Sequence, residues 1–65
     1  MPRMIEIVIE RWSGQNGTTF RWSLWRDGKR VGMGPGFASA EAAEAAATAA
    51  CIQELGSRPD RVTHL

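Results

Sequence analysis

Residues 39–50 read SAEAAEAAATAA, and this alanine-rich stretch decides the fold. Alanine has the highest helix propensity of any residue, so the stretch predicts a helix. Ser39 is a good N-cap and Gly56 a good C-cap, which places the helix at about residues 40–55. Because alanine side chains are short, we expect the helix backbone to lie close to the surface that it covers.

Three strands are predicted before this helix, at residues 4–12, 18–26 and 29–33. In the first, Ile5, Ile7 and Ile9 recur with a period of two residues, which is typical of a half-buried strand. Asn16-Gly17 and Asp27-Gly28 are strong hairpin signals between the strands. The sequence therefore predicts an α+β domain of βββα order, with a three-stranded antiparallel meander packed on one C-terminal α-helix.

The alternation of side chains assigns residues to the two faces of this predicted sheet. The residues expected to face the helix are Ile5, Ile7, Ile9, Phe20, Trp22 and Leu24. The helix is expected to present to them a stripe made of Ala40, Ala43, Ala47, Cys51 and Leu55. The residues expected to face solvent are Val8, Trp12, Arg21, Ser23, Trp25 and Arg30. In the third strand, Val31 and Met33 are expected inward and Gly32 outward.

A chain of 65 residues has room for one domain with one small core. We predict a single domain over residues 1–56 and an extended or disordered C-terminal tail over residues 57–65. Cys51 is the only cysteine, so no disulfide can form within the chain. A core of this size typically leaves only ~3–5 kcal/mol of net stability, and association with a second copy is one way to bury more surface.

The net charge of +1 hides a separation of charge along the chain. Residues 21–30 hold four basic side chains against one aspartate, whereas the predicted helix holds three glutamates and no basic residue. A local basic segment can attract an anionic partner even when the total charge is small. The N-terminus lacks the apolar core of a secretory signal, and no stretch approaches the ~20 apolar residues of a membrane helix. We therefore expect a bacterial, cytoplasmic protein without membrane association.

Side chains that could carry catalysis are scarce. His64 is the only histidine and lies next to the C-terminus, where it is poorly placed to act as a base. Glu6 and Glu10 share a strand face but lie ~13 Å apart, too far for the carboxylate pair of a glycosidase. Gly34-Pro35-Gly36 lacks the pattern of a phosphate-binding loop and is expected to connect strand to helix. The sequence thus predicts no catalytic residue, no cofactor and no metal site.

Two families resemble this chain over about residues 4–55. The segment Phe20-Arg21-Trp22-Ser23-Leu24, the turn Asp27-Gly28 and a helix that starts with the pattern S-x-x-x-A, here Ser39 to Ala43, resemble a set of small bacterial βββα proteins of unknown function. That resemblance implies the fold and no activity. A less specific resemblance is to the arm-binding domain of tyrosine recombinases and to the plant AP2 domain, which lay a three-stranded sheet into a DNA groove. It implies DNA contacts by Arg21, Trp25 and Arg30.

Tryptophan and arginine on the solvent side of a small sheet support two hypotheses about function. The first is a non-enzymatic interaction module that binds a protein partner or self-associates, through the sheet face or an open edge strand. The alternative is a nucleic-acid-binding domain whose arginines bind phosphates and whose tryptophans stack on bases. The candidate binding residues are Trp12, Arg21, Trp25, Arg26, Lys29 and Arg30.

A third interpretation gives these side chains a structural role only. Arg21 or Arg30 would stack on Trp25, with Glu6 or Glu10 paired alongside, as cross-strand neighbours in a sheet often do.

Overall fold

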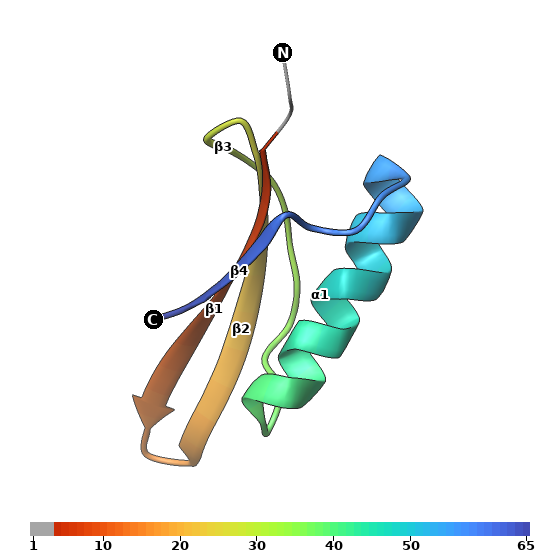
Figure 1. The fold of residues 1–65 in the computed structure, drawn as a ribbon. Coiled ribbons are helices and arrows are strands. Elements are labelled where there is room, and N and C mark those ends of the chain that lie inside the picture. The colour runs from red at the N-terminus through yellow and green to blue at the C-terminus, as the bar shows by residue number, and fades with distance from the viewer. Residues whose placement is uncertain (1–3) are drawn as a thin grey trace.

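The computed structural model describes residues 4–65 and shows five regular elements along the chain (Figure 1). They are β1 (Ile5–Gly14), β2 (Gly17–Arg26), β3 (Lys29–Met33), α1 (Ala40–Leu55) and β4 (Arg61–His64). The predicted α+β class, with one helix and a sheet, is confirmed. The first three residues of the domain predicted over 1–56 lie outside the described residues.

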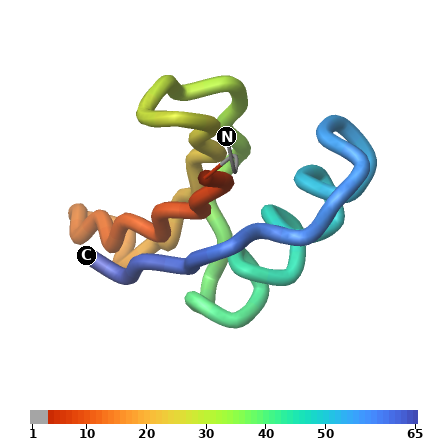
Figure 2. Tube along the Cα trace, turned by 45° about the horizontal axis from the view of Figure 1, so that its top comes forward, coloured from red at the N-terminus to blue at the C-terminus, as the bar shows by residue number. Residues whose placement is uncertain are grey.

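The sheet has four strands in the order β3-β2-β1-β4, so the predicted three-stranded meander is only part of it. β1, β2 and β3 form that antiparallel meander, and β4 pairs parallel to β1. The sheet is therefore mixed, and α1 is not the last element, because β4 follows it. Figures 1 and 2 both show the C-terminal segment running beside β1.

The segment 57–65, for which the sequence predicts an extended or disordered tail, contains this fourth strand. The Asp60 N–H donates to the Ile5 carbonyl at 2.7 Å, and the Asp60 carboxylate accepts from the Ile5 N–H at 2.8 Å. At the other end of β4, the Leu65 N–H donates to the Ile9 carbonyl at 2.9 Å. Between these contacts Val62 lies opposite Ile7 and packs on the core, so the segment is held along its length.

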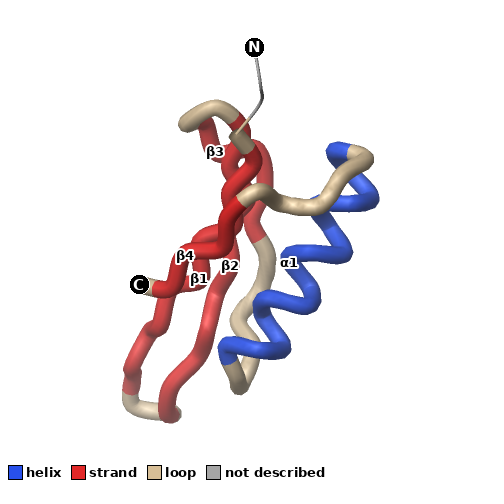
Figure 3. Tube along the Cα trace, in the orientation of Figure 1, coloured by secondary structure: helices blue, strands red, loops and turns tan. Residues whose placement is uncertain are grey.

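α1 covers one face of the sheet (Figure 3) and builds the core there. The fully buried apolar residues are Ile5, Ile7, Ile9, Leu24, Ala43, Ala47 and Cys51. Partly buried residues packed around them are Phe20, Trp22, Phe37, Ala40, Leu55 and Val62. The predicted inward faces of β1, β2 and α1 are therefore confirmed. The short alanine side chains let the helix approach the sheet, while isoleucine and aromatic side chains fill the volume.

The helix ends and the second hairpin also match their local signals. The Ser39 hydroxyl accepts a hydrogen bond from the Ala42 N–H at 3.1 Å, and Gly56 ends the helix with a φ of 74°. Asp27 and Gly28 have φ values of 53° and 82°, as a type I′ turn requires. In the first hairpin only Gly17 has a positive φ, at 108°.

The predicted inward face of β3 is wrong because the pairing of β2 with β3 contains a bulge. Trp25 lies opposite Arg30, but the next pair is Leu24 with Gly32, so Val31 is an extra residue. An extra residue reverses the alternation beyond it. Gly32 therefore lies over Leu24, and Met33 is 59% exposed.

The chain after β3 continues along β2 without forming a regular strand. The Gly34 N–H donates to the Trp22 carbonyl at 3.1 Å, and Phe20 and Phe37 exchange two hydrogen bonds of 2.8 Å. This segment brings Phe37 to the core beside the start of α1.

Candidate functional site

The face of the sheet opposite α1 carries most of the candidate binding residues, and we call it the outer face. In residues 4–65 no helix packs on it (Figures 1 and 3). By strand register it is formed by Glu6, Val8, Glu10, Trp12, Thr19, Arg21, Ser23, Trp25, Arg30, Met33, Arg61 and Thr63. The outward placement predicted for β1 and β2 is therefore observed.

Trp25 lies along its own strand on the outer face. Its indole Nε1–H donates to the Ser23 hydroxyl at 2.9 Å, two residues earlier on β2. The ring is half-buried, and Ser23 beneath it is only 7% exposed. The indole N–H of Trp25 thus has its hydrogen-bond partner within the chain, and the side chain is only partly exposed on the outer face.

Trp12 is different, because it is 53% exposed and, within the described part of the chain, its aromatic ring contacts the cation of Arg21. The Arg21 guanidinium carbon lies 5.7 Å from the centre of the Trp12 ring. The predicted stacking of an arginine on Trp25 is therefore replaced by stacking on Trp12. Glu10 lies opposite Arg21 in the register, yet no ion pair involving Arg21 forms within the described part of the chain.

The two tryptophans of the outer face do not form one cluster. Trp25 lies opposite Glu6, which is six residues along β1 from Trp12. At ~3.3 Å per residue the two positions are ~20 Å apart. The outer face therefore has two separate regions, one near β3 and one on the β1–β2 hairpin.

Arg26 and Lys29, the other two candidates, lie elsewhere. They pair with each other beside the Asp27-Gly28 turn, and Arg26 lies opposite Ile5. This register puts them on the side of the sheet that faces α1, at its end. Of the six candidate residues, four lie on the outer face: Trp12 with Arg21 on the hairpin, and Trp25 with Arg30 near β3.

Sequence reasoning missed the contribution of β4 to the outer face. The Thr63 hydroxyl donates to Glu6 Oε2 at 2.6 Å, and Arg61 Nε donates to the same oxygen at 3.1 Å. These two bonds, the Thr63 bond first, hold the pKa of Glu6 below its usual value. The only sequence signal was the alternation within residues 61–64, which is too short to be read as a strand.

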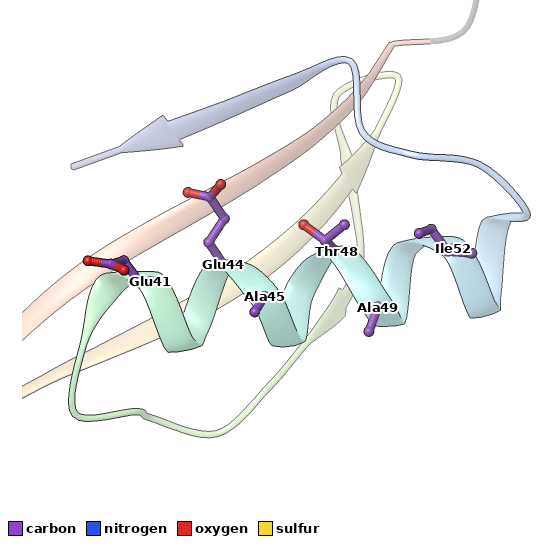
Figure 4. Close-up of a pocket in the computed structure, with 6 residues that line it drawn as sticks. All are labelled: Glu41, Glu44, Ala45, Thr48, Ala49 and Ile52. Atoms are coloured by element: carbon purple, nitrogen blue, oxygen red, sulfur yellow. The ribbon is translucent and has the colours of Figure 1, made fainter.

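Two of the hollows on the surface bear on the candidate site. One, of about 500 Å³, follows the exposed side of α1 and is lined by Glu41, Glu44, Ala45, Thr48, Ala49 and Ile52 (Figure 4). Figure 4 shows Glu44 and Thr48 on one side of the helix and Ala45 and Ala49 on the other. Glu44 Oε1 lies 3.1 Å from His64 Nε2 and ties α1 to β4.

The other hollow, of about 370 Å³, lies on the β1–β2 hairpin and includes two candidate residues. It is lined by Trp12, Ser13, Gly14, Gln15, Asn16, Gly17, Thr19 and Arg21.

No group of three or more His, Cys, Asp or Glu side chains among residues 4–65 could hold a metal ion. Cys51 is buried, its Sγ donates to the Ser57 carbonyl at 3.1 Å, and burial raises the pKa of its thiol. Within the same range, no helix has the length and apolar character needed to cross a membrane.

Comparisons with protein-family models, curated proteins and solved structures found no significant match to this chain. The family resemblances of the sequence therefore stay predictions.

Proposed function

We propose that this protein is a non-enzymatic interaction module that self-associates through the outer face of its sheet. The observation that supports this is a set of apolar side chains that spans that face from β3 to the end of β4, which we call the central patch: Val8, Trp25, Met33 and, by the alternation of Arg61 and Thr63, Leu65. Met33 and Leu65 are 59% and 74% exposed. Exposed apolar side chains gathered on one face of a sheet are typical of a protein interface.

The charges around the central patch favour a second copy of the chain as the partner. The outer face carries three arginines and two glutamates: Arg21, Arg30, Arg61, Glu6 and Glu10. A face that holds both signs can meet its own copy across a two-fold axis without a large like-charge penalty. A partner surface that carries charges of one sign only would not be complementary to this mixture of positive and negative side chains.

The area of the face predicts a weak dimer. The four strands have 10, 10, 5 and 4 residues. With strands ~4.8 Å apart and ~3.3 Å per residue, the face projects roughly 450 Å². Two copies would then bury about 1,000 Å² in total, which is at the small end of specific interfaces. The contact should therefore be sought at high protein concentration.

The sheet edges are less suited to association than the face. β3 is bulged, carries Lys29 and Arg30, and is followed by Pro35, all of which discourage pairing with another strand. β4 is four residues long and begins with an arginine. The bacterial cytoplasmic setting predicted from the sequence is part of the same proposal.

Sedimentation measurements from about 10 µM to about 1 mM protein test the proposal. The sedimentation coefficient should rise with concentration, and Met33→Asp should weaken association by at least roughly tenfold by burying an unpaired charge. Ile52→Asp is the matched control, since Ile52 is also an exposed apolar residue but lies on α1. A monomer at the highest concentration, or an equal loss with Ile52→Asp, would show that the outer face is not the interface.

A further inference from the structure

The hollow on the β1–β2 hairpin lies away from the central patch. Residues 11–19 form the end of this hairpin, and we call them the hairpin arm. Every one of them is exposed. Trp12 is four residues along β1 from Val8, or ~13 Å. A ligand in this hollow therefore avoids a dimer contact confined to the patch, whereas a dimer that covers the whole outer face would compete with it.

Two facing glycines form the floor of the hollow. Gly14 lies opposite Gly17 in the register of β1 and β2. A Cβ atom added to either would meet no other atom within 4 Å, so the space above both is open. Trp12 and Thr19, the next pair on the same side of the arm, rise beside this floor.

The side chains around the floor suit a ligand that combines a planar ring with a negatively charged group. Trp12 offers an exposed aromatic ring, and Arg21 holds its guanidinium over that ring. Arg21 makes no hydrogen bond or ion pair to another side chain within residues 4–65, so its N–H donors are free for a ligand. Gln15 and Asn16 add carboxamides, and no acidic residue lines the hollow.

We propose that the hairpin hollow binds a nucleotide, with the base stacked on Trp12 and a phosphate bound by Arg21. Aromatic rings stack on nucleobases of any sequence, and arginine forms strong paired hydrogen bonds with phosphate. A free mononucleotide and one unit of a single-stranded nucleic acid share this chemistry. The volume of about 370 Å³ lies within the range of small-molecule pockets.

The arm offers matched variants that separate this site from general charge attraction. Arg21→Gln removes the proposed phosphate ligand, whereas Arg11→Gln removes an equal charge from the other side of the arm, opposite Phe20. Gly14→Val fills the floor, and it should not disturb the fold because Gly14 lies in a strand with open space above it and has no positive φ.

The experiment is a two-dimensional NMR titration of the full chain with adenosine and uridine monophosphates and with a ten-nucleotide oligothymidylate. We expect the Trp12 indole N–H and the Gly14 and Gly17 amides to shift, while the Trp22 indole stays in place. Arg21→Gln and Gly14→Val should each weaken binding by roughly tenfold or more, and Arg11→Gln by no more than about twofold.

The two ligand sources give different results. If a mononucleotide binds as tightly per site as the oligonucleotide, the site takes free nucleotides. If only the oligonucleotide binds, and its affinity falls with salt at a slope of ~0.7 per phosphate contact, the site takes a single strand. The proposal is overturned if neither ligand shifts the Trp12 indole at millimolar concentration, or if Arg11→Gln weakens binding as much as Arg21→Gln. It is equally overturned if Gly14→Val binds like the unchanged chain.

Discussion

Replacing Gly34 by alanine tests how the chain after β3 packs on the core. The Gly34 N–H donates to the Trp22 carbonyl, and this hydrogen bond holds the segment after β3 against the backbone of β2. A Cβ atom on Gly34 would lie 2.1 Å from Cε2 and 2.2 Å from Nε1 of the Trp22 indole. Ordinary van der Waals contact begins at 3.4 Å, so either the ring or the main chain has to move.

Both movements lower the free energy of unfolding. The Trp22 ring packs against the core, and its buried Nε1 has no hydrogen-bond partner among the described residues, so packing alone fixes it. Overpacking costs ~1–3 kcal/mol, and loss of the Gly34 hydrogen bond adds about 1 kcal/mol, which gives about 3 kcal/mol for Gly34→Ala. That is close to the whole net stability of ~3–5 kcal/mol for a domain of this size. The melting temperature should fall by roughly 12–24 °C.

Thermal and urea unfolding, followed by circular dichroism, measure the effect. Gly32→Ala is the matched control, because its Cβ would lie 3.7 Å from the Leu24 Cβ, an ordinary contact. We expect it to change stability by less than about 1 kcal/mol. Adding Trp22→Leu to Gly34→Ala should cost less than Trp22→Leu alone, since the clash is then gone. Equal unfolding midpoints for Gly34→Ala and Gly32→Ala would refute the close approach of Gly34 to the indole.

Three further predictions concern the core and β4. Because Thr63 and a neighbouring guanidinium lower the pKa of Glu6, its contribution is complete above pH 4.5 and is lost as the pH falls through the lowered value. The stability difference between the unchanged chain and Glu6→Gln should therefore shrink in acid, and a pH-independent difference in urea midpoint would contradict this. Ala47→Leu should destabilise by ~1–3 kcal/mol through overpacking beneath α1, whereas Ala45→Leu, at an exposed position, should not. Burial of Cys51 should slow its alkylation in the folded chain by roughly a hundredfold or more relative to the chain in urea, and mass spectrometry showing equal rates would exclude this packing.

Much of the fold could be predicted because its local signals agree with one another. The alternating isoleucines of β1 identify the buried face, and a one-residue slip would expose all of them. Ser39 and Gly56 set the ends of α1 through hydrogen bonds made within a few residues. Asp27-Gly28 fixes the second hairpin because few other residue pairs adopt two positive φ values. Each of these features depends on neighbours in the chain.

The features that could not be predicted depend on contacts between distant segments. β4 becomes a strand only because β1 offers it an edge, with Asp60 and Ile5 exchanging hydrogen bonds across most of the chain length. The bulge at Val31 depends on how β3 meets β2, and nothing in residues 29–33 alone indicates it. Such non-local pairing leaves no periodic pattern in a four- or five-residue strand.

The sequence could predict which face of the sheet carries the candidate residues, but not which of their side chains contact one another. Strand parity placed Trp12, Arg21, Trp25 and Arg30 on the outer face. It could not tell which arginine would stack on which ring, because diagonal neighbours lie within reach of long side chains as well as direct ones. Arg21 lies diagonally from Trp12, and this choice leaves Trp25 bonded to Ser23.

β4 also changes the electrostatics of the outer face. Without this strand β1 would be an edge, and Glu6 would be an unpaired carboxylate beside the central patch. Paired with Thr63 and Arg61, Glu6 no longer opposes an approaching carboxylate or phosphate, and it no longer needs a cation from a partner. The side of the sheet near β4 is thereby close to neutral, while Arg21 and Arg30 carry positive charge toward the arm and β3. A region near neutral favours contact between copies, and a cationic arm favours a phosphate, so the two proposed contacts are centred on different parts of a single sheet.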